Sequence, residues 1–242
     1  MKSEIKSAFK TSIPVLFGYM AIGIAFGLVL VDAGYDWWFA PLMSIIVYAG
    51  AAQFIAIGLF AAGTPLFAII ITELLVNIRH IVYGLSLITR FQNCGKWKPY
   101  LVFALTDETY SLLTCTDVPE GQKPADFYGF VSLFDQSYWV LGSTIGALFG
   151  ALIPFDMTGV DFALTALFAV LTVEQIMKTK DLVPTLAGAI SVIIAILLWR
   201  FGYLGDSSNI LFVALALGIG TILLMKKNNL KEDSNGSTGN TI

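Results

Sequence analysis

Long apolar runs alternate along the chain with short connections that contain glycine, proline or charged residues. The runs can be placed near 12–31, 38–61, 65–89, 99–115, 130–153, 162–177, 183–200 and 208–225. Because a helix needs about 20 apolar residues to cross a bilayer, runs of these lengths are typical of transmembrane helices. The pattern predicts an all-α polytopic membrane protein with about seven or eight transmembrane helices.

The composition agrees with this class and leaves no room for a soluble domain. The 242 residues are 57% hydrophobic and 13% charged, with a mean hydropathy of +0.78, whereas soluble domains carry about 25% charged residues. We therefore predict one transmembrane domain over residues 1–225, embedded in the lipid bilayer, and a disordered polar tail over residues 226–242. The net charge of -3 comes without a basic patch, so no nucleic-acid partner is expected.

The first apolar run resembles a signal peptide in part, and the two cysteines raise the question of a metal or redox site. The run follows several lysines, as in a signal peptide, but it is too long for one and no A-x-A-like site closes it. We expect it to be an uncleaved first span. Cys94 and Cys115 fit no metal or redox spacing and are predicted to be free thiols.

Two parts of the chain resemble each other. The segment IGIAFGLVL at 22–30 matches IGALFGALI at 145–153, and WFA at 38–40 matches DFA at 161–163, both with an offset of 123 residues (145 − 22 and 161 − 38). Duplicated halves are common in transporters, whose sites lie between them. We predict two related halves, at about 12–89 and 135–200; the alternative is that spans rich in Gly, Ala and Phe resemble one another by composition alone.

The basic residues constrain the number of crossings. Eight simple crossings with the N-terminus inside satisfy the positive-inside rule for Lys2, Lys6, Lys10, Lys178, Lys180, Lys226 and Lys227, but not for Arg90, Lys96 and Lys98. The exception disappears if 38–89 crosses an odd number of times, for example through a broken or re-entrant element near AGAAQF at 49–54. An odd count would make the halves inverted rather than parallel, and the sequence leaves both arrangements open.

The run at 65–89 carries polar residues on a defined face. On a helix, Glu73, Asn77 and His80 fall on one stripe, and Arg79 lies on an adjacent one. Because a charge in the bilayer centre costs at least about 2.5–3.5 kcal/mol, we expect Glu73 and Asn77 to face a bundle interior or an aqueous cavity. Arg79 and His80 have the alternative of lying near a boundary and extending to the interface.

A second polar cluster lies in ALTDETYSLLT at 104–114, where Asp107 and Glu108 are adjacent acids in an apolar span. Desolvation raises the pKa of a carboxyl group and an opposing cation lowers it, so such groups can take up and release protons. We predict a proton-coupling role for Asp107, Glu108 and the later Asp135. The alternatives are a static Arg79–Asp107 bridge and a merely interfacial Asp135.

Small residues mark two further features. Gly142, Gly146 and Gly150 recur every four residues, as do Gly23 and Gly27, which predicts close packing of helices. In YAGAAQFIA, the small residues around Gly50 and Gln53 allow a helix to break and offer backbone N–H groups to a carboxylate. The alternative for Gln53 is a hydrogen-bonded side chain in an ordinary packing face.

Motifs typical of enzymes are missing from the sequence. It contains no H-E-x-x-H, G-x-S-x-G or P-loop pattern. The single histidine has no Cys or His neighbours that would make a metal site. We therefore expect neither catalysis nor a metal or other cofactor.

The segments GAAQFIAIGLFAAGTP, LLVNIRHIVYGLSL and LTDETYSLL follow an N-terminal span of the form FKTSIPVLFGYMAIGIAFG. In this order and spacing they resemble the AzlC-type branched-chain amino acid permeases over about residues 8–200. The resemblance implies a multi-pass exporter of leucine, isoleucine and valine in the cytoplasmic membrane, with a small AzlD-type membrane subunit as partner.

A zwitterionic substrate needs partners for both of its charges. We expect its ammonium group at Glu73 or Asp107 and its carboxylate at Arg79 or at the backbone around Gly50 and Gln53, with Asn77 and His80 lining the same site. The rival interpretations are a channel or an auxiliary subunit without a coupled cycle, and an intramembrane enzyme, which the missing motifs disfavour.

Overall fold

The computed structural model describes residues 2–152 and 182–205, together with positions 169, 172, 173, 176, 177, 180, 209, 210, 213, 214, 216–218, 220 and 221. The chain forms two compact units, residues 1–166 and 167–242. In the second unit, α9 (Val183–Arg200) matches the predicted span 183–200 and carries Pro184 in its first turn, where a missing N–H is harmless. The spans predicted at 162–177 and 208–225 lie largely outside the described residues, and the tail at 226–242 lies entirely outside them.

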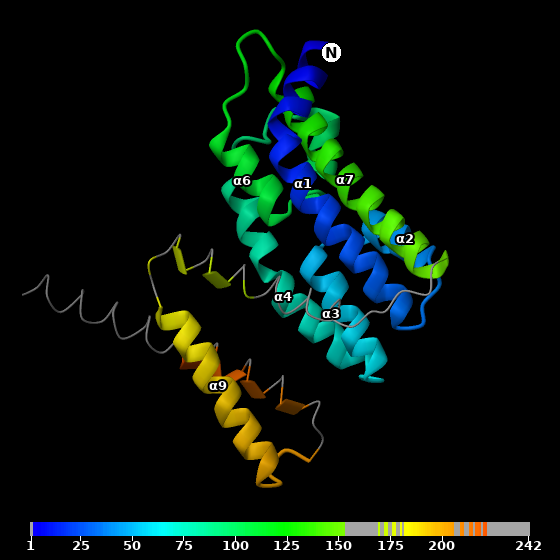
Figure 1. Cartoon of the computed structure of the whole chain (residues 1–242). Coiled ribbons are helices and arrows are strands. Elements are labelled where there is room, and N and C mark those ends of the chain that lie inside the picture. Colours follow the sequence, from blue (N-terminus) through cyan, green and yellow to red (C-terminus); the bar gives the residue numbers. More distant parts are fainter. Residues whose placement is uncertain are drawn as a thin grey trace, which may run out of the picture. The chain divides into compact units, whose positions relative to one another are not determined.

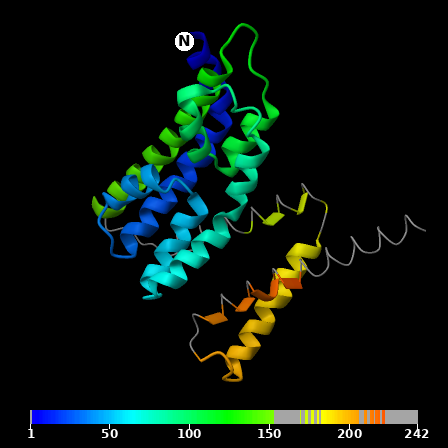
Figure 2. The same ribbon diagram turned by 180° about the vertical axis from the view of Figure 1, so that it is seen from behind.

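Two long helices form the frame of the first unit. Helix α1 (Lys2–Asp32) and helix α7 (Pro124–Leu152) lie side by side and run in the same direction (Figures 1 and 2). Phe9 contacts Phe134 near their beginnings, and Ser12 shares a hydrogen bond of 2.9 Å with the hydroxyl of Tyr138. The unit has two ends, which we name by the direction of α1. This helix begins at the first end and finishes at the second end.

Glycines bring α1 and α7 into backbone contact. A Cβ atom on Gly23 would lie 3.0 Å from the backbone nitrogen of Ser143, and one on Gly27 would overlap the backbone of Ser143 and Ala147. On α7, a Cβ atom on Gly146 would overlap the backbone of Ile24. The close packing predicted from the glycine spacing is therefore confirmed.

A first helical hairpin enters the unit from the second end. It consists of α2 (Phe39–Ile46) and α3 (Gly50–Ala61), separated by residues 47–49. Tyr35, just after α1, contacts both Phe39 at the start of α2 and Phe60 near the end of α3. The chain thus enters and returns to the same end, so the single helix predicted over 38–61 is wrong, and of the arrangements left open by the sequence the one with a broken element near AGAAQF is present.

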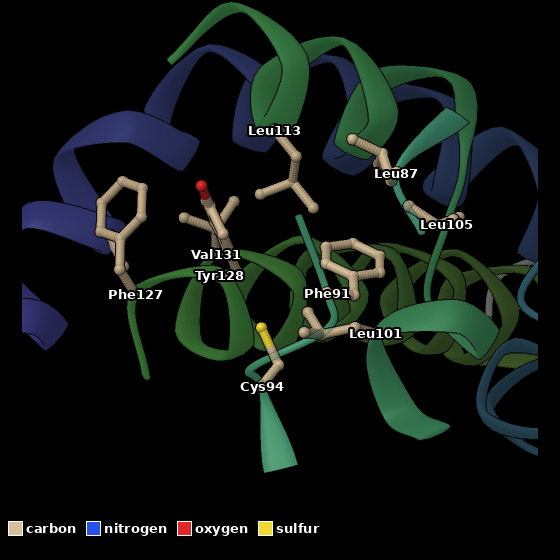
Figure 3. Close-up of a cluster of buried hydrophobic side chains, with 10 residues drawn as sticks. Leu87, Phe91, Cys94, Leu101, Leu105, Leu113, Phe127, Tyr128 and Val131 are labelled. Carbon is tan, nitrogen blue, oxygen red and sulfur yellow. The ribbon is translucent and has the colours of Figure 1, made fainter. Parts of the chain in front are cut away.

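A second helical hairpin enters from the first end. After the short 3₁₀ turn η1 (Gly95–Trp97), α5 (Lys98–Phe103) runs inward and α6 (Asp107–Cys115) returns, separated by residues 104–106. A cluster of buried side chains holds both ends of this hairpin against the beginnings of α1 and α7 (Figure 3): Ala8, Leu87, Phe91, Cys94, Leu101, Leu105, Leu113, Phe127, Tyr128 and Val131. The single helix predicted over 99–115 is therefore wrong as well.

Helix α4 (Leu66–Ser86) joins the two ends. Its end leads directly to Leu87 and Phe91 in the cluster around Ala8, so the chain from 38 to 89 makes one net passage. Arg90, Lys96 and Lys98 therefore follow at the end where α1 begins, and the exception to the positive-inside rule disappears.

The second hairpin adds no net passage, so α1 and α7 are parallel despite the odd count over 38–89. The matched segments 22–30 and 145–153 consequently run in the same direction. The second part of the match, at 161–163, lies outside the described residues, and the repeat stays a prediction. Among the described residues, α1, α4 and α9 are long and apolar enough to span a membrane.

Both cysteines are free, as predicted. Cys94 is buried and Cys115 is exposed.

Candidate functional site

The tips of the two hairpins meet in the interior of the first unit. Tyr48, at the tip of the first hairpin, is 2% exposed, and its ring lies 6.4 Å from that of Phe103 at the end of α5. The tip bends sharply enough that Tyr48 has a φ of 45°, a conformation rare for a residue with a side chain. Because a helix break frees backbone N–H and C=O groups, both tips need polar surroundings.

A chain of oxygen atoms connects two acids at this level. Asp135 Oδ2 lies 2.8 Å from the hydroxyl of Thr109, which lies 3.0 Å from the hydroxyl of Thr106. The Thr106 hydroxyl lies 2.5 Å from that of Tyr19, which donates to Glu108 Oε2 at 2.8 Å. We call these five residues the oxygen chain; they come from α1, α7 and the tip and first turns of α6.

The local structure of α6 explains the positions of its members. Thr106 is the N-cap of α6, and its hydroxyl accepts a hydrogen bond from the backbone N–H of Thr109 at 3.2 Å. Asp107 and Glu108 follow in the first turn, where the helix dipole favours negative charge. The N-cap thus fixes one hydroxyl of the chain, and the first turn of the helix carries the two acids.

Asp107 faces α4 rather than the oxygen chain. Its Oδ2 forms an ion pair of 2.7 Å with Arg79, and its Oδ1 accepts a hydrogen bond of 2.5 Å from Tyr83. The Arg79–Asp107 bridge considered from the sequence is present, so Arg79 does not simply extend to an interface. The stacked rings of Tyr83 and Tyr110, with centroids 4.4 Å apart, hold the same helices together one turn further on.

Asp135 lies deep in the unit. Helix α7 begins at Pro124, earlier than predicted, so Asp135 occupies its middle and is 0% exposed. The interpretation of Asp135 as an interfacial residue is therefore wrong. Within the described part of the chain, its Oδ1 has no hydrogen-bond partner. The next residue, Gln136, donates to the carbonyl of Ile45 at 3.2 Å and accepts from the Tyr100 hydroxyl at 2.8 Å, which ties both hairpins to α7.

Glu73, Asn77 and His80 form a separate group along α4. The amide of Asn77 donates to the carbonyl oxygen of Glu73 at 2.9 Å, and His80 Nδ1 lies 3.1 Å from the carbonyl oxygen of Asn77. All three are half-buried, while Leu74 and Ile78 on the opposite face are 63% and 57% exposed. The predicted polar stripe is thus distinct from the apolar face, and its last member, His80, has its ring 5.7 Å from that of Tyr83, the residue that donates to Asp107.

Gln53 and Gly50 lie at the start of α3, against Trp139. The Gln53 side chain is 0% exposed; it accepts from the Trp139 indole N–H at 2.9 Å and donates to Ser44 at 3.3 Å. A Cβ atom on Gly50 would lie 3.0 Å from the Trp139 ring. Helix α3 has no side-chain cap, so the N–H groups of its first turn, rather than the Gln53 amide, can donate hydrogen bonds to an anion.

The residues that sequence reasoning missed are the hydroxyl-bearing ones: Tyr19, Tyr48, Thr106 and Thr109. Thr106 had a usable signal, because a threonine followed by two acids marks a helix start and would have placed a break within the run at 99–115. Tyr19 had no comparable signal, since a tyrosine in an apolar helix is common at any depth.

No group of three or more His, Cys, Asp or Glu residues among the described residues could hold a metal ion. The acids instead contact hydroxyl groups and one arginine.

Comparison with known proteins identifies relatives whose match covers all residues of the candidate site. The AzlC protein family matches residues 14–153, which include the oxygen chain, both hairpins and α4. The chain is 37% identical to the branched-chain amino acid transport protein AzlC of Bacillus subtilis over 77% of its length and 73% of that protein. It is 40% identical to an uncharacterized membrane protein of Helicobacter pylori (92% and 95% covered) and 32% identical to the inner membrane protein YgaZ of Escherichia coli (74% and 76%). No solved structure matches the chain significantly.

Proposed function

Because the chain belongs to the AzlC family, we propose that it is a secondary transporter that exports leucine, isoleucine and valine across the cytoplasmic membrane. We further propose that transport is coupled to protons and that a small AzlD-type membrane subunit assists it. The name of the Bacillus subtilis relative supports the substrate class. The direction of transport rests on the sequence resemblance alone, and the coupling rests on the acids Asp107, Glu108 and Asp135.

One observation carries the proposal of a transporter: two broken helices, entering from opposite ends, meet beside buried acids. The tip of the first hairpin places Tyr48 near Phe103, and the second places Thr106 against Tyr19. Discontinuous helices with inward-facing termini form the substrate and ion sites of many transporters. A channel needs a continuous polar path instead, whereas here the acids are enclosed by side chains from α1, α6 and α7.

The charges of the site favour one orientation of the substrate. Arg79 is already balanced by Asp107 at 2.7 Å, so the uncapped start of α3 at Gly50 is the better partner for a carboxylate. Of the two expected ammonium partners, Asp107 is likewise balanced by Arg79, so the group is assigned to Glu73, whose Oε1 is buried without a hydrogen-bond partner in the described structure. Asn77 and His80 line this side of the site.

Counterflow in proteoliposomes tests the proposed activity. Purified protein, with and without the small subunit, is reconstituted with unlabelled leucine inside and traces of labelled leucine outside. Saturable uptake that requires internal leucine supports a carrier. Non-saturable flux would favour a channel, and consumption of leucine would favour an enzyme. Transport by the small subunit in the absence of this chain would favour an auxiliary role for this chain.

Substrate analogues test the assignment of the charged groups. Leucinol and isopentylamine keep the amine and lack the carboxylate, so both should compete more weakly than leucine. If the Arg79→Gln variant retains discrimination between leucine and leucinol, the carboxylate is bound elsewhere, as expected for the start of α3. Equal competition by leucine and leucinol in the unmodified protein would contradict both carboxylate assignments.

A further inference from the structure

The oxygen chain has more hydrogen-bond links than its hydroxyl groups can fill. Five oxygen atoms, from Asp135, Thr109, Thr106, Tyr19 and Glu108, form four links of 2.8, 3.0, 2.5 and 2.8 Å. Each hydroxyl group has one hydrogen, whereas an ionised carboxylate has none. With both acids ionised, three hydrogens serve four links, and one pair of oxygens faces each other without a hydrogen.

One additional proton completes the chain. If Glu108 carries it, Glu108 donates to Tyr19, Tyr19 to Thr106, Thr106 to Thr109, and Thr109 to Asp135. If Asp135 carries it, every bond points in the opposite direction. The same four pairs of oxygens are linked in both arrangements. The arrangements differ in which acid carries the proton and in the direction of the hydrogen bonds. When Tyr19 donates to Glu108, Thr106 to Thr109 and Thr109 to Asp135, the link between Tyr19 and Thr106 is the one that lacks a hydrogen until this proton is added.

We propose that Tyr19, Thr106 and Thr109 form a relay that holds one proton and passes it between Glu108 and Asp135. The proposal rests on the proposed proton coupling and assigns its path. Glu108 lies next to Asp107, the acid that contacts α4, whereas Asp135 lies on α7 inside the frame. The relay thus connects the side of the site that faces Arg79 with the frame helices.

The step conserves all atoms and electrons. The O–H bond of Glu108 breaks as its proton binds the Tyr19 oxygen, and the hydrogens of Tyr19, Thr106 and Thr109 each move one link along. A new O–H bond forms on Asp135 Oδ2. The three hydroxyl groups end neutral and reversed in direction, so the net result is one proton moved from one carboxylate to the other.

The surroundings of the two acids contain few other groups that can titrate. Asp107 and Arg79 lie beside Glu108, and they balance each other as an ion pair. Tyr48, Tyr100 and Tyr138 surround Asp135. No cation faces Asp135 among these groups, and its buried, unpartnered Oδ1 makes a permanent negative charge costly there.

Infrared difference spectroscopy tests the relay without any substrate. The reconstituted full-length protein should show the C=O band of one protonated carboxyl group at neutral pH, and both Glu108→Gln and Asp135→Asn should change it. Tyr19→Phe and Thr109→Val should shift this band, because they remove a link, whereas Thr109→Ser keeps the hydroxyl and should leave the band in place. A band absent from the unmodified protein, or unaffected by Tyr19→Phe and Thr109→Val, overturns the relay.

Transport provides the second measurement. Tyr19→Phe and Thr109→Val should lower leucine accumulation driven by a pH gradient by about 100-fold, the low end for loss of a positioned proton-transfer group. The loss should be larger for gradient-driven accumulation than for leucine exchange at equal pH, because exchange needs no net proton transfer. Thr109→Ser, which keeps the hydroxyl group, should retain the gradient-driven rate of the unmodified protein.

The outcomes separate the relay from the proposed function. If the unmodified protein exchanges leucine and Tyr19→Phe keeps its full gradient-driven rate, the relay is overturned and the transporter stands. If the unmodified protein does not exchange leucine, the proposed function fails, and the infrared result alone decides on the relay. Should Tyr19→Phe fail to fold by size-exclusion chromatography, the comparison of Thr109→Val with Thr109→Ser decides.

Discussion

The contact between α1 and α7 can be tested with a single methyl group. In Gly146→Ala, the new Cβ atom would lie 2.7 Å from both the Cα and the carbonyl carbon of Ile24, whereas carbon atoms pack at about 3.5–4.0 Å. The carbonyl oxygen of Ile24 would lie closer still, and all three colliding atoms belong to the backbone, so no side chain can rotate away. The helices must separate by about 1 Å, and overpacking of this kind costs about 1–3 kcal/mol.

Gly150→Ala is the matched control, one turn further along the same face of α7. Its Cβ atom would meet only side chains, with Leu28 Cδ2 and Val31 Cβ at 3.4 Å. Both variants gain the same helix propensity of about 1 kcal/mol, so the difference between them isolates the overlap. At about 2 kcal/mol, this difference corresponds to about 4–8 °C in melting temperature for a chain of this size.

The measurement is thermal unfolding in detergent, followed by tryptophan fluorescence and by loss of the monodisperse chromatography peak. We expect Gly146→Ala to melt well below Gly150→Ala and to lose transport, because Tyr19 packs edge-on against Trp139 across the same contact at 5.5 Å. Equal melting temperatures for the two variants would refute the close packing of the backbones.

Three further predictions concern α4, the acids of α6 and the cysteines. Single cysteines at positions 73, 77, 80 and 84, in a background without Cys94 and Cys115, should react with a membrane-impermeant thiol reagent and be protected by leucine, whereas cysteines at 74 and 78 should not react. Reactivity that rises toward one end of α4 regardless of face would show that the stripe is only an interface anchor. Asp107→Asn and Glu108→Gln should each abolish gradient-driven transport and spare exchange at equal pH; full gradient dependence in both would make the pair structural. Burial raises the pKa of the Cys94 thiol, so less of it is thiolate at pH 8, and maleimide should label Cys115, which is exposed, faster than Cys94. Mass spectrometry of time points would show this, and equal rates would contradict the burial of Cys94.

The sequence was sufficient for features set by local pattern. The apolar runs predicted the helices α1, α4 and α9, and the glycine spacing predicted the contact between Gly23, Gly27 and Gly146. The small residues near Gly50 only allowed the first break, because an Ala- and Gly-rich segment offers little side-chain packing to keep a helix continuous, and the sequence left a continuous helix equally open. Each of these features depends on neighbours within a few residues or on one helix face.

The second hairpin could not be predicted from hydropathy. The run at 99–115 has the length of a crossing, and only Thr106, followed by two acids, indicated a helix start within it. The position of Asp135 was missed for a related reason, since α7 extends back to Pro124 through a segment that is too polar to be recognised as part of a span. Contacts between distant residues, such as Tyr19 with Thr106, depend on how the hairpins pack and have no signal in sequence periodicity.

The arrangement of the oxygen chain links proton movement to the position of the second hairpin. Tyr19 lies on α1 and Asp135 on α7, the two frame helices whose backbones are in direct contact. Thr106, Glu108 and Thr109 belong to the second hairpin, so the links to Tyr19 and to Asp135 all cross from frame to hairpin. A shift of the hairpin tip by about 1 Å away from the frame would lengthen links of 2.8 Å beyond hydrogen-bond distance. In the proposed relay, the proton can therefore pass only while the tip is seated against α1 and α7. Arg79 holds Asp107 of the same tip at 2.7 Å, which connects the position of the tip to α4 and to the side of the site where we place the substrate.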